Sequence, residues 1–163
     1  MGQIKDTFEE IYQEYYPMVF QICFGYFKGE EEIAKDASQE VFIIIWKNLK
    51  KFKGESSIKT WIYRITVNTC LGQIKADSRR KEALNHVHRD HRDANLDDSV
   101  SKLYKAIGQL NKTDRLIIMM VLEKEKQKTI AEILGIEETN LRVKIHRIKI
   151  KLGKILEMMR DER

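Results

Sequence analysis

The 163-residue chain is 42% apolar and 34% charged, with a net charge of +5, one proline and eight glycines. This composition supports a folded core and excludes a disordered tail or a collagen-like fibre. No apolar run approaches the roughly 20 residues that cross a bilayer, and residues 1–6 lack a signal-peptide pattern, so we expect a cytoplasmic protein without a membrane span. Cys23 and Cys70 lie far apart in apolar-periodic segments, which favours reduced core thiols over a disulfide framework or a zinc site.

Apolar residues recur at helical spacing in nearly every segment, and no segment alternates convincingly as a strand would. The first stripe covers residues 8–27, where Pro17 is expected to begin or kink a second helix and Gly29 to act as a stop signal. An acidic first turn then opens a helix over residues 30–49, since acidic side chains favour the positive end of a helix dipole. These segments predict an all-α protein.

A short loop over residues 54–57 precedes the next helix, with Ser57 as a plausible N-cap. This helix is expected to run from about residue 58 to residue 80. Residues 82–98 then lose the periodicity and are mostly polar, which predicts a flexible linker. We therefore expect two small helical domains, over residues 1–81 and 99–163.

The second domain is predicted to contain four helices. One ends near Asn111, another covers residues 116–121, and a short one over residues 130–134 is followed by Gly135, which suits a left-handed turn. The last helix begins near residue 138. This short helix, glycine turn and long helix are typical of a helix-turn-helix.

Charge alternates in blocks along the chain. Residues 1–46 hold nine acidic and three basic side chains, whereas residues 47–81 hold ten basic and two acidic ones. The linker is acidic and the second domain basic. Folded basic blocks with interleaved aromatics indicate a nucleic-acid partner, because neutralising phosphates releases counterions. The acidic first block suggests a basic protein partner, although solvated charged faces are the simpler alternative.

Three surfaces are candidates for binding. Asp36, Gln39 and Glu40 share one helix face, near Phe42 and Trp46, and could form a docking patch or a solvated acidic face above a core. The stretch after Trp46 interleaves cations with aromatics, as binding of an unpaired strand requires, although the spacing of its aromatics also suits a core. Residues 140–154 contain six Lys or Arg and no acid, which suits a major-groove helix. The alternative there is a basic amphipathic helix for a membrane surface or a protein partner.

Two other classes of function remain as alternatives. His86, His88 and His91 could reach one metal ion, although they lie in the linker without cysteine neighbours. A helical adaptor that binds only protein is the other. No catalytic triad, phosphate-binding glycine loop or paired-carboxylate site stands out, so we expect neither an enzyme nor a bound cofactor or metal.

Several motifs carry a resemblance to a known family. The first domain contains Asp36-Ala-Ser-Gln-Glu-Val-Phe, then Phe52-Lys-Gly-Glu-Ser and Thr60-Trp-Ile-Tyr-Arg-Ile-Thr-Val-Asn68. This domain resembles region 2 of an extracytoplasmic-function sigma factor of the sigma-70 family. The second contains Ile130-Ala-Glu-Ile-Leu-Gly-Ile136 and Arg142-Val-Lys-Ile-His-Arg147, which are similar to region 4 of the same family.

The resemblance implies partners as well as a fold. It implies bacterial core RNA polymerase, through the clamp helices of its largest subunit and its flap, together with promoter DNA and an anti-sigma factor. The residues implied to face polymerase are Asp36, Gln39, Glu40 and Trp46. Those implied at the −10 element, where a loop holds a flipped base, are Phe52, Lys53, Ser56, Ser57, Ile58, Lys59, Trp61, Tyr63, Arg64 and Asn68. Those implied at the −35 element are Thr139, Asn140, Arg142, Val143, Lys144, His146 and Arg147.

Overall fold

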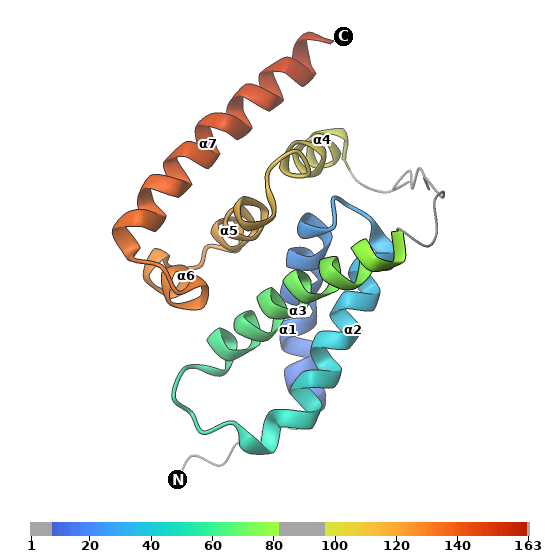
Figure 1. Cartoon of the computed structure of the whole chain (residues 1–163), viewed down its shortest axis with the longest axis vertical. Helices are drawn as coiled ribbons and strands as arrows, with labels where there is room; N and C mark the ends of the chain where they lie inside the picture. The colour runs from blue at the N-terminus through green and yellow to red at the C-terminus, as the bar shows by residue number, and fades with distance from the viewer. Residues whose placement is uncertain (1–7, 82–96, 163) are drawn as a thin grey trace.

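The computed structural model describes residues 8–81 and 97–162, and every regular element within them is helical, as expected for the all-α class (Figure 1). The predicted linker falls almost entirely outside the described residues. Among these residues no helix is long and apolar enough to span a membrane. The elements in chain order are α1 (Phe8–Tyr26), α2 (Glu31–Asn48), the 3-10 helix η1 (Leu49–Lys51), α3 (Ile58–Lys81), α4 (Asp98–Ile107), α5 (Lys112–Leu122), α6 (Gln127–Leu134) and α7 (Glu138–Asp161).

The first bundle is made of α1, α2 and α3. α1 continues through Pro17 as one 19-residue helix, so the expectation that a second helix begins there is wrong. The proline removes one backbone donor, but its side chain is exposed while Met18, Val19 and Ile22 beside it are buried. Packing of this apolar face therefore outweighs the lost hydrogen bond.

The two cysteines join α1 to α3 in the core of this bundle. Both are free and buried, as expected, but they are not far apart in space, since Cys23 Sγ lies 3.8 Å from Cys70 Sγ. The thiol contact and burial together hold the pKa of Cys70 well above its usual value. The two cysteines are 47 positions apart in the sequence, and they meet in space because α1 and α3 pack side by side.

Two turn residues that the sequence singled out have the expected roles. The Thr60 N–H donates to Ser57 Oγ at 3.1 Å, which makes Ser57 the N-cap of α3. Gly135 has a φ of +67°, in the left-handed region, and ends α6 so that α7 can leave in a new direction.

The second bundle contains α4 to α7. Asn111 caps α5, because its Oδ1 accepts the Asp114 N–H at 2.9 Å. The expected apolar stripe of α7 faces the other helices, with Leu141, Ile145 and Ile148 buried.

The two bundles pack directly against each other, with α5 lying on α1 and α6 near α3 (Figure 1). Arg115 of α5 is only 5% exposed, and its Nε donates to the Tyr26 carbonyl of α1 at 2.9 Å. Its guanidinium carbon also lies 5.1 Å from the centre of the Tyr26 ring. A continuous apolar core therefore includes residues of both bundles.

Tyr26 supplies a test of this packing. Its buried hydroxyl has no hydrogen-bond partner among the described residues, and burial is the main cause that raises its pKa to about 12. Because an unpaired buried hydroxyl is costly, we expect Tyr26→Phe to keep or raise the free energy of unfolding at pH 7, by up to about 1 kcal/mol. Urea denaturation followed by circular dichroism measures this change.

The same substitution has a pH dependence of known sign. Because the native pKa is raised to about 12, the unfolded chain loses this proton more readily than the native one, and the free energy of unfolding falls as the pH rises from 10 toward 12. Tyr26→Phe should therefore lose less stability than the wild type across this window, whereas Tyr12→Phe, an exposed control, should follow the wild type. A large destabilisation of Tyr26→Phe at pH 7 would contradict the absence of a hydroxyl partner.

Candidate protein and nucleic-acid interfaces

The predicted docking patch lies on the surface of α2. Asp36, Gln39, Glu40 and Trp46 are all exposed. Trp46 is 65% exposed, which is unusual for the largest apolar side chain.

Beside this patch the structure reveals an apolar groove between α1 and α2. Its volume is about 440 Å³. It is lined by Phe8, Tyr12, Gln39, Phe42, Ile43 and Trp46. Tyr12 and Phe42 pack edge to face across it, with ring centres 4.8 Å apart. The contribution of α1 was missed in the sequence, where the only available signal was the spacing of Phe8 and Tyr12, four residues apart on one helix face.

The loop before α3 brings two predicted base-contacting aromatics together. The ring centres of Phe52 and Trp61 are 5.0 Å apart, and both side chains are half-buried. Ser56 and Ile58 are also half-buried, whereas Lys53 is exposed at the start of the loop. The pair forms a small aromatic platform with a cation beside it, a combination that can stack and hold an unpaired base.

The predicted residues farther along α3 divide between surface and core. Arg64 and Asn68 are exposed one helical turn apart, on the side of α3 that also carries Trp61. Tyr63, in contrast, is fully buried, and its hydroxyl has no hydrogen-bond partner among the described residues. Burial raises the pKa of Tyr63 well above its usual value, and the carboxylates of Glu125 and Glu123 add to the rise.

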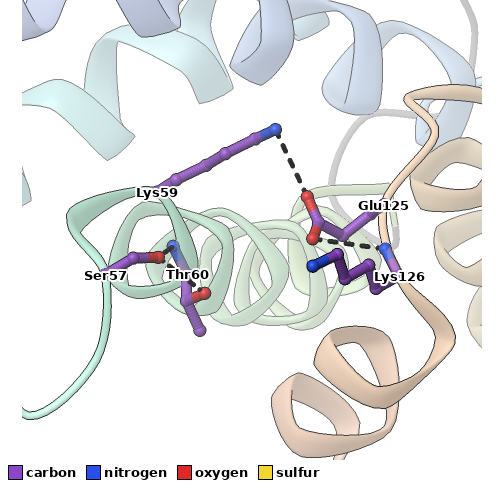
Figure 2. Close-up of polar contacts among 5 residues, drawn as sticks. All are labelled: Ser57, Lys59, Thr60, Glu125 and Lys126. Atoms are coloured by element: carbon purple, nitrogen blue, oxygen red, sulfur yellow. Dashed lines mark hydrogen bonds and ion pairs between the residues drawn. The ribbon is translucent and has the colours of Figure 1, made fainter.

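The turn between α5 and α6 contacts the start of α3. Lys59 Nζ lies 3.3 Å from Glu125 Oε2. Figure 2 draws this ion pair as a dashed line. The Lys126 N–H donates to the other oxygen of the same carboxylate at 3.3 Å. The Lys59 nitrogen also lies 5.9 Å from the centre of the Tyr63 ring. In this arrangement Lys59, a predicted DNA contact, pairs with Glu125 while its own side chain stays 46% exposed.

All the predicted base-reading residues of α7 lie on its surface. They occupy the first three turns after Gly135, between the buried side chains of the apolar stripe. They are Thr139, Asn140, Arg142, Val143, Lys144, His146 and Arg147. Arg142 forms a long ion pair with Glu138, at 4.0 Å, and the remaining cations give this face a strong positive charge. A helix of this charge and exposure, after a left-handed glycine turn, is suited to the major groove.

Metal binding finds no further support in the described residues. His86, His88 and His91 lie outside them, and no group of three or more potential ligands is assembled within residues 8–81 and 97–162.

Comparisons with known proteins agree with the motifs. Residues 11–80 match the family Sigma-70 region 2, and residues 101–152 match Sigma-70, region 4. The chain is 26% identical to the RNA polymerase sigma factor YlaC of Bacillus subtilis, over 97% of this chain and 96% of that protein.

Two solved structures are similar in fold. The sigma factor RpoE of Bartonella quintana, in complex with the anti-sigma factor NepR, gives a TM-score of 0.76 at 17% identity and covers 92% of this chain and 96% of its own. CnrH, in complex with the cytosolic domain of CnrY, gives a TM-score of 0.67 at 19% identity and covers 93% of this chain and 88% of its own.

Proposed function

This chain belongs to the extracytoplasmic-function sigma factors of the sigma-70 family, and we propose that its two bundles recognise separate elements of one promoter. Members of this family are non-enzymatic initiation factors that bind RNA polymerase and direct it to promoters. In our proposal residues 1–81 act as region 2, residues 82–98 as the linker and residues 99–163 as region 4. The protein would work in the cytoplasm.

The observation that carries this proposal is the exposed basic face of α7 behind the left-handed turn at Gly135. Residues near the start of such a helix read base edges, and Arg or Lys can pair with guanine O6 and N7 or hold phosphates. We assign this face, from Thr139 to Arg147, to the −35 element. The flap of polymerase would hold the same bundle near the DNA.

The Phe52–Trp61 platform supports a role for the loop before α3 at the −10 element. Extruding a base costs a few kcal/mol, so the loop must bind the unpaired base better than duplex DNA for strands to separate. Lys53, Ser56, Ser57, Ile58 and Lys59 would surround that base. Tyr63, Arg64 and Asn68 would follow the adjacent strand or duplex edge.

The α1–α2 groove supports docking on polymerase. An apolar groove beside Asp36 and Glu40 fits a helical partner with apolar anchors and a basic rim. We assign it to the clamp helices of the largest polymerase subunit. One of the similar solved structures is a sigma factor in complex with an anti-sigma factor, and we propose that an anti-sigma factor regulates this chain too.

Run-off transcription tests the proposal as a whole. Added to bacterial core polymerase, the chain should select a defined subset from a randomised promoter library. Transcription with no promoter preference would contradict the proposal.

The role of the α1–α2 groove predicts a loss of polymerase binding. Trp46→Ala should weaken binding to core polymerase about tenfold or more, because an exposed aromatic anchor is lost. Met158→Ala, which removes a side chain exposed to the same degree on α7, should leave this binding unchanged.

The role at the −10 element predicts a difference between two assays. Phe52→Ala and Asn68→Ala should reduce open complexes more than they reduce binding to duplex promoter, because these side chains are assigned to unpaired DNA. Permanganate footprinting reports the open complex and a gel shift reports total binding. Gln109→Ala, an exposed substitution on the other bundle, serves as the control. An equal loss in both assays would count against base trapping.

The role of α7 predicts a change in salt dependence. Arg147→Ala should weaken binding to the −35 element, and its slope of log K against log salt should be about one unit shallower if the guanidinium holds a phosphate. Arg160→Ala removes the same charge from the exposed far end of α7 and should leave the slope unchanged. A slope that Arg147→Ala does not alter would contradict a phosphate contact.

A further inference from the structure

We propose that Val143 recognises the C5-methyl group of a thymine in the −35 element, so that this base becomes a determinant of promoter choice. The inference rests on the proposed function, which assigns the outer face of α7 to this element. It adds the chemical group that one side chain of that face contacts.

Val143 lies at the middle of the outer face of α7. Each residue of an α-helix is turned by about 100° from the one before it. The buried residues that define the inner side of the helix are Leu141, Ile145, Ile148 and Leu152, and Val143 falls nearly opposite their mean direction. Because α7 runs along the outer edge of the molecule (Figure 1), a ligand that binds this face meets Val143 at its centre.

Folding alone does not explain a valine at this position. The side chain of Val143 is 50% exposed, and the apolar core formed by the described residues does not include it. A β-branched side chain also lowers helix propensity, because it loses χ1 freedom against the preceding turn. The fold therefore gains little from this valine, and its apolar surface is available to a ligand.

The surroundings of Val143 indicate which kind of ligand fits. The residues three and four positions away on the same face are exposed and polar, and they are Thr139, Asn140, His146 and Arg147. A protein partner would bury a contiguous apolar patch, whereas Val143 is one apolar group within a ring of hydrogen-bonding groups. The major-groove edge of an A·T pair has the matching pattern, because the thymine methyl is its one apolar group beside acceptors and a donor.

The position of Val143 along α7 suits a contact with a base. It is the sixth residue of the helix, about 7.5 Å from its start, and residues near the start of a recognition helix read base edges. Ile150 lies in a similar direction around the helix and is 47% exposed, but it is about 10 Å farther along the axis. Ile150 is therefore out of reach of the base that Val143 contacts, and it provides a matched control.

A valine at this position also discriminates against other bases. Its side chain has no hydrogen-bond donor or acceptor, whereas a serine in its place could bond to any base. A cytosine opposite Val143 would bury its amino group without a partner, which weakens binding. Val143 thus favours thymine by an apolar contact and disfavours cytosine through the unpaired donor.

Removal of single methyl groups from the promoter tests this inference. Uracil pairs with adenine as thymine does but lacks the C5-methyl group. The duplexes are promoters that core polymerase carrying this chain selects from a randomised library, with each thymine of the −35 element replaced in turn by deoxyuridine. At least one replacement should weaken binding about fourfold in a competition gel shift, the effect expected for the loss of one methyl contact.

A pair of variants assigns the methyl contact to one side chain. Val143→Ser removes both methyl groups of the valine, so polymerase carrying this variant should bind the thymine and uracil duplexes equally. Ile150→Ser removes an apolar side chain of similar exposure and should keep the fourfold preference. Each preference is a ratio of two duplexes on the same protein, so a change in folding or in polymerase binding cancels.

The outcomes separate this inference from the proposed function. A promoter-specific polymerase for which no uracil replacement in the −35 element weakens binding would overturn the methyl contact alone. A thymine preference that Val143→Ser retains, or that Ile150→Ser also removes, would overturn its assignment to Val143. A polymerase that selects no promoter would contradict the proposed function itself, and this inference with it.

Discussion

One buried guanidinium fixes how the two halves of this sigma factor meet. Arg115 leaves water almost completely, and burial lowers its pKa, yet an arginine stays charged inside a protein. Such a charge is tolerated only where acceptors surround it, and here the carbonyls of Tyr26 and Leu110 supply them. Sliding α5 along α1 would break the bond to Tyr26 and leave the Leu110 carbonyl as the remaining acceptor of the two, so this hydrogen bond favours one register of α5 on α1.

This register also explains how the binding surfaces are distributed. α1 and α3 are shared, since each packs inside its own bundle and against the second bundle, whereas α2 packs on α1 and α3 and keeps its outer face free. α7 is free in the same way, with one side against its bundle and the charged side in water. The surface assigned to duplex DNA is therefore on α7, away from the bundle contact, and the surface assigned to polymerase is mostly on α2, with Phe8 and Tyr12 contributed by α1. The surface assigned to unpaired DNA is on α3, which takes part in the bundle contact.

Much of the fold follows from local patterns. Apolar spacing located the helices, and Ser57 and Gly135 marked boundaries because a hydroxyl cap and a left-handed residue act within one turn. The prediction that a second helix begins at Pro17 was wrong, because burial of the neighbouring apolar side chains stabilises α1 across the proline. Local sequence rules do not include this packing. The α1 side of the groove, the Cys23–Cys70 contact and the burial of Arg115 and Tyr63 could not be predicted, because they depend on which helices meet and at what register. From the sequence alone, Arg115 cannot be distinguished from the exposed cations around it.

The contact between the two thiols has a practical consequence for labelling chemistry. Alkylating reagents attack the thiolate, and here both sulfurs are out of water while the pKa of Cys70 is held high. We therefore expect the native cysteines not to react with maleimides while the first bundle is folded. A single cysteine introduced on an exposed helix would carry one fluorophore at one site, with no need to remove the natural pair and create a hole where it packs.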